Sequence, residues 1–284
     1  MRNRWALGIL LMITELFCPA AEVVRYPALS AAHDPNRAYV VAVLQLALAK
    51  SGKSYDLVSD PTIPMQQGRA IAEARSATGK VDVIWTMTTK EREAQLLPIR
   101  IPIDKGLLGW RIPLLDANRT DLLSELATLT DLQRWKAGQG HDWPDTEILR
   151  SNGLNVVTSC CYDTLFSMML AGRFDYFPRS IMEIWVDIAN HPTMPLVADS
   201  HVVIHYPAAA YFFVSPRRPR LAKDLQTGLE RAIADGSFEA VFQAQLGPYI
   251  ERAQLGRRRI IELTNPLLDV TSLPLERPEL WYRP

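Results

Sequence analysis

Apolar and polar residues alternate in blocks that predict a repeated strand-then-helix order through the first hundred residues. Residues 37–50 carry apolar side chains at helical spacing and end at Ser51-Gly52, a typical helix stop. The other predicted elements of this block are strands at 22–27, 55–59 and 81–87 and helices at 66–77 and 89–97. Strands that alternate with helices in this way indicate a parallel sheet with right-handed crossovers.

The same alternation starts again further along the chain, after a predicted helix at 121–128 and extended segments at 100–103 and 107–115. The second block comprises predicted strands at 134–138, 154–158 and 174–177 and helices at 144–152, 163–171 and 180–189. Extended segments at 201–206 and 211–214 follow, and then a long helical region at 219–246 that Gly236 interrupts. We therefore expect two α/β lobes in tandem, a return to the first, and a proline-containing tail from Arg257 on the surface.

The N-terminus has the three parts of a secretory signal peptide. Arg2 and Arg4 supply positive charge, residues 5–17 are mostly apolar, and residues 18–21 end in small side chains. We predict cleavage near Ala21 and a periplasmic location; the alternative is a buried N-terminal helix. Because no later stretch reaches the roughly 18 apolar residues of a membrane span, a soluble monomer is expected after cleavage.

Charge and motifs argue against several classes of function. Lys+Arg and Asp+Glu both number 31, and the one dense basic run, 257–259, reads as a solvated face, so nucleic-acid binding is not expected. The sequence lacks the common nucleophile, zinc, phosphate-loop and dinucleotide motifs. We therefore expect no catalytic site, no cofactor and no metal.

Cys160 and Cys161 are adjacent, which favours one buried and one exposed thiol, with a vicinal disulfide as the alternative in an oxidising compartment.

Three segments have the composition of ligand-contacting turns. In the first, residues 81–92, a buried strand leads through Thr88 and Thr89 into a helix that carries Arg92 early. A guanidinium binds a carboxylate through two parallel hydrogen bonds, and a strand-to-helix turn adds free N–H groups and threonine hydroxyls. The alternative is a surface arginine paired with Glu91 or Glu93.

The second segment is Lys136–Asp145, which reads as a strand end, a glycine-rich turn and a helix start. Gly138 and Gly140 would let the backbone approach a ligand closely, although an ordinary tight turn explains them equally well. Trp143 offers either a flat apolar wall for a ligand or a packing contact.

The third segment is Gly172–Ser180, with Asp175 in the strand and Arg179 at the following strand-to-helix turn. Ligands of open α/β sheets bind at such turns. Arg179 is equally well placed to pair with Glu183 one helical turn later, and Asp175 to make a structural hydrogen bond.

In the order of its elements and in these three segments, the chain from about Val24 to Leu246 resembles the periplasmic solute-binding proteins of family 3, which serve amino-acid importers. The resemblance implies a two-lobed type II periplasmic-binding-protein-like fold, each lobe a mainly parallel sheet flanked by helices. Residues 22–115 with 202–284 would form lobe 1 and residues 116–201 lobe 2. It also implies a ligand in the cleft and a set of contacting residues, with Arg92 on a ligand carboxylate. That set is Tyr26, Thr88, Thr89, Arg92, Gly140, Trp143, Asp175 and Arg179.

The sequence departs from the family pattern at 26–39, where the usual acidic helix start is missing. The residue that would bind a ligand amino group therefore cannot be assigned from the sequence. This departure weakens the expectation of a free amino acid as the ligand. We expect a small polar ligand, anionic or amino-acid-like, and a membrane permease or a sensor kinase as partner. The alternatives are a degenerate envelope sensing or interaction domain and an exported enzyme on the same scaffold.

Overall fold

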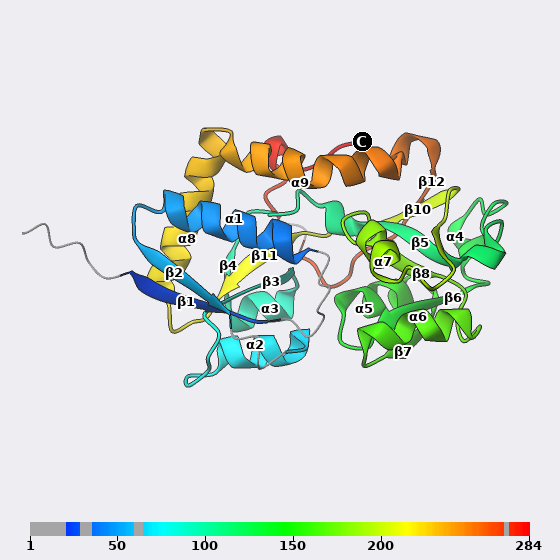
Figure 1. Cartoon of the computed structure of the whole chain (residues 1–284), viewed down its shortest axis with the longest axis horizontal. Coiled ribbons are helices and arrows are strands. Elements are labelled where there is room, and N and C mark those ends of the chain that lie inside the picture. The colour runs from blue at the N-terminus through cyan, green and yellow to red at the C-terminus, as the bar shows by residue number, and fades with distance from the viewer. Residues whose placement is uncertain (1–20, 29–35, 60–64, 270–272) are drawn as a thin grey trace, which may run out of the picture.

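A computed structural model describes residues 21–28, 36–59, 65–269 and 273–284, and in it two α/β lobes lie side by side (Figure 1). The first lobe contains β1 (Glu22–Tyr26), α1 (Arg37–Lys50), β2 (Tyr55–Ser59), α2 (Gln67–Arg75), β3 (Val83–Met87), α3 (Lys90–Gln95), β4 (Leu97–Ile99), β11 (Ala210–Val214) and α8 (Pro219–Ala234). The second contains β5 (Trp110–Asp116), α4 (Leu129–Leu132), β6 (Lys136–Gly140), α5 (Pro144–Ser151), β7 (Asn155–Ser159), α6 (Tyr162–Leu170), β8 (Phe177–Ser180), α7 (Ile184–Asn190), β9 (Leu196–Ala198), β10 (Val202–His205) and β12 (Arg259–Glu262). Helix α9 (Ser237–Ala253) runs along both lobes. The predicted signal peptide lies outside the described residues, apart from Ala21.

Most predicted elements form near their expected positions. Helix α1 and strand β2 have the predicted bounds, and α1 buries a face made of Tyr39, Val40, Val43, Leu44, Ala47 and Leu48. The three-to-four-residue spacing of that face gives a single apolar stripe, which packs against α8. The predicted break at Gly236 separates α8 from α9, because Gly236 adopts a φ of +78°.

The first lobe is built on strands that the chain revisits. Strands β1 and β2 pair in parallel, while β11 lies between β3 and β4 and is antiparallel to both. The N–H of Asp82 donates to the Arg25 carbonyl at 2.8 Å and joins β1 to the edge of β3. The return strand therefore closes the first lobe after the chain has built most of the second, which lacks only β12 at that point.

The second lobe has its own sheets, with β12, β10, β5 and β8 side by side and β6 paired in parallel with β7. Strand β5 is antiparallel to β8, β9 and β10. The predicted boundary at 115 falls inside β5, and the predicted boundary at 202 falls at the first residue of β10, which it would assign to the first lobe. The chain therefore crosses between the lobes at about 100–109, before the first predicted boundary, and at about 206–209, after the second. The difference arises because strand pairing, and not the order of elements in the sequence, decides to which lobe a strand belongs.

Two predicted elements are corrected. Residues 121–128 form successive turns, not a helix, with hydrogen bonds such as Leu122 N–H to the Arg119 carbonyl that span only three residues. The third strand of the second block begins at Phe177, not at 174, because Asp175 and Tyr176 donate their N–H groups to the Lys136 carbonyl ahead of β8. Strands β9 and β12 were not predicted.

The tail after α9 crosses between the lobes as well. Strand β12 adds to the second-lobe sheet by parallel pairing with β10. The chain then returns: Asn265 donates to the Pro207 carbonyl, the Leu267 carbonyl accepts from Lys90 N–H, and Leu268 and Leu273 join a first-lobe core. Within the described residues, no helix has the length and apolar character that a bilayer span needs.

Candidate functional site

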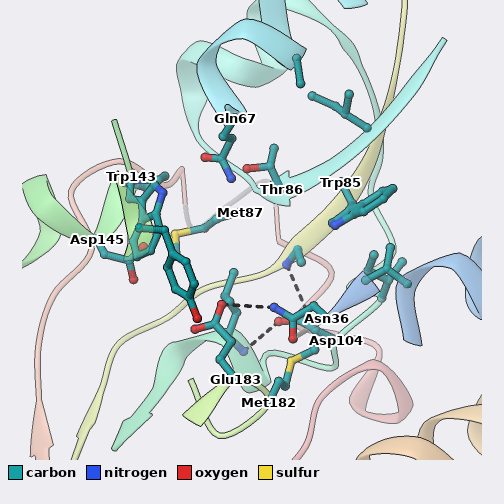
Figure 2. A pocket seen from close by; sticks show the side chains of 18 of the residues that line it. Asn36, Gln67, Trp85, Thr86, Met87, Asp104, Trp143, Asp145, Met182 and Glu183 are labelled. Atoms are coloured by element: carbon teal, nitrogen blue, oxygen red, sulfur yellow. Dashed lines mark hydrogen bonds between the residues drawn. The ribbon is translucent and has the colours of Figure 1, made fainter. Parts of the chain in front are cut away.

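A cavity of about 190 Å³ lies where the two lobes face each other, next to the segments at 100–109 and 206–209 where the chain crosses between them. The first lobe lines it with Gln67, Trp85, Thr86 and Met87, and the second lobe lines it with Trp143, Asp145 and Glu183 (Figure 2). Arg179 also belongs to the second-lobe lining. Fourteen of its 23 lining residues are apolar or aromatic, so a few polar groups stand out on a mostly apolar surface.

The turn between β3 and α3 holds Arg92 directly behind the first-lobe wall. Thr89 is the N-cap of α3, and its side chain accepts a hydrogen bond from the Arg92 N–H at 3.2 Å. The Arg92 guanidinium points back toward the cavity wall. There it donates to Thr86 Oγ1 at 2.6 Å, to the Met87 carbonyl at 2.9 Å and to Gln67 Oε1 at 2.7 Å.

Arg92 is a buried charge held by neutral groups. Its side chain is only 8 % exposed, and among the described residues no carboxylate lies within ion-pair distance of its guanidinium. Burial lowers the pKa of Arg92 to about 10, although the charges of Asp145 and Asp142 oppose that shift. A buried cation that has no ion-pair partner beside a cavity is stabilised by an anionic group that enters the cavity.

The second-lobe wall is different because each of its two arginines forms salt bridges with two carboxylates. Arg111 contacts Asp145 at 2.5 Å and Glu183 at 3.1 Å. Arg179 contacts Glu183 at 3.2 Å and Asp187 at 2.5 Å. Two tyrosine hydroxyls complete the network, with Tyr162 donating to Asp187 and Tyr206 donating to Asp145.

This network, which we call the second-lobe ion cluster (Arg111, Asp145, Arg179, Glu183 and Asp187), contains two cations and three carboxylates. Burial opposes ionisation of Glu183, but the charges of Arg179 and Arg111 outweigh it and hold the pKa of Glu183 below its usual value. Burial raises the pKa of Asp187 despite the Arg179 charge. With every member ionised, the cluster carries one excess negative charge, and Asp145 and Glu183 are its carboxylates on the cavity wall.

Two hydrogen bonds join the lobes, one at the cavity and one between residues next to its lining. Asn36, at the start of α1, donates to Glu183 Oε1 at 3.2 Å (Figure 2). The N–H of Gly68 in α2 donates to Asp142 Oδ2 at 3.3 Å. The lobes are therefore in contact across the cleft.

Trp143 forms the aromatic part of the second-lobe wall. Its ring lies 6.3 Å from Phe177 and 6.4 Å from Tyr162, and the Arg179 guanidinium lies 5.3 Å from its centre. Gly140 is required beneath it, because a Cβ at that position would approach the indole within 2.6 Å. Gly140 thus makes room for a tryptophan, where the sequence had suggested room for a ligand.

Of the eight residues predicted to contact a ligand, Trp143 and Arg179 line the cavity. Arg92 lies one layer behind it, Thr89 caps α3, and Thr88 donates to Glu93 at 2.6 Å. Tyr26 lies next to Trp85, with ring centres 6.1 Å apart. The structure does not bring Asp175 to the cavity, since it pairs with Arg119 at 3.0 Å and accepts from the N–H of Lys136 at the opposite end of β6 from Gly140.

Several lining residues were not predicted. Asp104 is buried in the crossing segment and accepts N–H bonds from Leu108 at 2.9 Å and Ala210 at 3.0 Å; burial raises its pKa despite those bonds. Gln67 sits in a helix whose sequence has no special signature, whereas Asp145 ends the predicted segment Lys136–Asp145 but was not itself chosen as a ligand contact. The one available signal was the four-residue spacing of Arg179 and Glu183, which form both a salt bridge and part of the cavity wall.

No protein-family model matches the chain, and comparison with curated proteins found no match. Solved structures do match. An arginine-specific periplasmic binding protein of Salmonella typhimurium is 14% identical with a TM-score of 0.59, covering 80% of this chain and 100% of its own. A histidine kinase sensor domain similar to periplasmic binding proteins is 17% identical with a TM-score of 0.58, covering 81% and 97%.

A third structure, concerned with glutathione import in Streptococcus mutans, is 13% identical with a TM-score of 0.59 and covers 89% of this chain and 100% of its own. At these identities the likeness shows the fold. The chain has the two-lobed periplasmic-binding-protein-like fold, and the resemblance inferred from its sequence is confirmed at that level.

Proposed function

We propose that this protein is an exported solute-binding protein that closes on a small amino-acid-like ligand without converting it. The observation that carries the proposal is the buried Arg92 guanidinium, which has only neutral hydrogen-bond acceptors, beside an inter-lobe cavity. A ligand carboxylate would replace the Gln67 side-chain oxygen on Arg92 and supply the missing negative charge. The amino-acid-binding proteins among the structural neighbours support the same class of ligand.

The second-lobe ion cluster suggests how the other end of the ligand is held. Its excess negative charge, on Asp145 and Glu183 at the cavity, favours a cationic group such as an ammonium. The sequence offered no acidic residue for that role. Trp143 would pack against the ligand body, and Arg179 would keep the carboxylates in place without touching the ligand.

The ligand class is tested by isothermal titration of the purified protein with a matched series. An amino acid is compared with the amine that lacks its carboxylate and the acid that lacks its amino group. We expect the zwitterion to bind best and the amine to lose most affinity, because it leaves Arg92 uncompensated. Absence of binding by every member of an amino-acid and organic-acid panel contradicts the proposal.

Arg92→Ala should abolish binding of carboxylate ligands, because it removes the cation behind the first-lobe wall. Arg92→Lys should bind weakly, since an ammonium cannot form the two parallel hydrogen bonds of a guanidinium. Arg69→Ala is the matched control, because Arg69 is exposed on α2 and should leave affinity unchanged. Equal affinity of Arg92→Ala and the unmodified protein would show that the carboxylate lies elsewhere; circular dichroism verifies folding of each variant.

The N-terminal charge and apolar pattern supports a periplasmic location, where the partner would be a permease or a sensor kinase that reads the closed form. A histidine kinase sensor domain is among the structural neighbours, which supports a sensor kinase as the second candidate partner. Recovery of the bound ligand unchanged, monitored by NMR over hours, separates binding from the enzymatic alternative. A ligand that is consumed would favour an enzyme on this scaffold.

A further inference from the structure

Cys160 and Cys161 lie at the turn between β7 and α6, next to the second-lobe wall of the cavity. The sequence favoured one buried and one exposed thiol, but both are exposed. Their sulfur atoms are 3.1 Å apart, which is closer than ordinary sulfur contact. The Ser159 hydroxyl fixes this turn by accepting from the Cys161 N–H and donating to its carbonyl, both at 3.1 Å.

We propose that this pair is a reversible redox-modification site whose oxidation to a vicinal disulfide resets the turn that holds Tyr162 on the cavity wall. One cysteine thiolate attacks an external disulfide, of a small molecule or of a protein, forms a mixed disulfide with it and releases one of its two thiols. The second cysteine then attacks this mixed disulfide, forms the vicinal bridge and releases the other external thiol. The pair loses two protons and two electrons and gains an S–S bond, and the external disulfide is reduced to two thiols.

Covalent geometry makes this bond reversible. The Cα atoms of adjacent residues are about 3.8 Å apart, whereas disulfides usually join Cα atoms about 4.4–6.8 Å apart. A bridge between neighbours is therefore strained, and strained, exposed disulfides are the readily reduced ones. A bridge here closes no long loop and adds nothing to fold stability, so its consequence is local.

The local consequence falls on Tyr162, the first residue of α6 and the neighbour of Cys161. Tyr162 lines the cavity, donates its hydroxyl to Asp187 and lies near Trp143, with the two rings tilted and their centres 6.4 Å apart. The Arg179 guanidinium lies 5.4 Å from the Tyr162 ring. A changed backbone at 160–161 moves this ring and with it the contact between Trp143 and the ion cluster.

The test uses the full chain in a Cys18→Ser background, equilibrated in mixtures of glutathione and glutathione disulfide. Mass spectrometry after alkylation should show an intramolecular bridge, two hydrogen atoms lighter, whose fraction follows the glutathione ratio. Mixed disulfides alone, or a bridge that persists in a large excess of reduced glutathione, overturn the proposal.

The structural half is read from the indole N–H NMR signal of Trp143, assigned by Trp143→Phe. We expect that signal to shift between reduced and oxidised protein. The signal of Trp281, which lies in the region where the chain crosses between the lobes, should stay in place. The Cys160→Ser/Cys161→Ser variant should show neither response. An unmoved Trp143 signal in fully oxidised protein, or the same shift in the double-serine variant, overturns the coupling to Tyr162. No ligand is used, so the outcome is independent of the ligand-binding proposal.

Discussion

The buried carboxylate of Glu183 contributes both to the stability of the fold and to the wall of the cavity. It contacts both Arg111 and Arg179, accepts from Asn36 across the cleft and lies on the cavity surface. Because its pKa is held below the ordinary value of 4.5, the ionised form stabilises the fold at neutral pH. Removing one member of such a network leaves the others buried and unpaired.

Glu183→Gln is therefore expected to lower the free energy of unfolding at pH 7 by about 3–5 kcal/mol, measured by urea denaturation. Stabilisation by a carboxylate with a lowered folded pKa is present above the unfolded pKa and is lost as pH falls through the folded pKa. The difference between variant and parent should thus shrink below about pH 4.5. Glu251→Gln, on an exposed position of α9, is the control and should change stability by less than about 0.5 kcal/mol. A gap that stays constant with pH would contradict the role of the charge.

At the scale of elements, the close approach of α1 and α8 depends on one glycine. A Cβ on Gly228 would lie 1.8 Å from the Ala47 carbonyl oxygen, so the two helix backbones touch at this point. Ala47 is fully buried on the apolar face of α1. Neither helix can move aside without disturbing the first-lobe core.

Gly228→Ala should destabilise the protein by about 3 kcal/mol, because overpacking outweighs the gain in helix propensity of about 1 kcal/mol. Gly256→Ala is the matched control, since a Cβ there meets open space, and its effect should stay within about 0.5 kcal/mol. Thermal or urea unfolding of both variants decides the point. Equal stability of the two would mean that α1 and α8 can separate freely.

At the scale of the whole molecule, the tail holds the region where the chain crosses between lobes. Trp281 packs on Gly106, where a Cβ would approach its ring within 2.9 Å, and the Tyr282 N–H donates to the Lys105 carbonyl at 2.8 Å. Lys105 and Gly106 both have positive φ angles, 50° and 77°. The largest buried cluster passes through the same region, from Leu44 of α1 through Trp110 to Phe177. Motion of one lobe against the other must therefore move the tail.

Trp281→Ala should cost about 2 kcal/mol of stability and speed amide hydrogen exchange at 105–109, leaving exchange in β6 and β7 unchanged. Leu275→Ala in the same tail is the control, because Leu275 is 50 % exposed and should affect neither quantity. Faster exchange spread evenly over the protein would indicate general destabilisation. It would contradict a specific role of Trp281 in the region where the chain crosses between the lobes.

Local patterns determined the order of elements in this protein. Apolar spacing and the Ser51-Gly52 stop were enough to place α1, and the Gly236 break separated α8 from α9. These features depend on residues close together in the chain, so the sequence alone carried them. The tandem β/α order likewise predicted two lobes and, through the family resemblance, the fold.

Tertiary structure decided the partners of each side chain. Arg92 lies in the first turn of α3 and Arg179 in β8, where the sequence had suggested a strand-to-helix turn. Arg179 pairs with Glu183 and Asp187, whereas Arg92 has only neutral hydrogen-bond acceptors. Strand pairing assigned β5, β10 and β12 to the second lobe and brought Asp104 to the cavity. Such contacts join residues far apart in sequence, so burial and charge compensation exist only once the chain has folded.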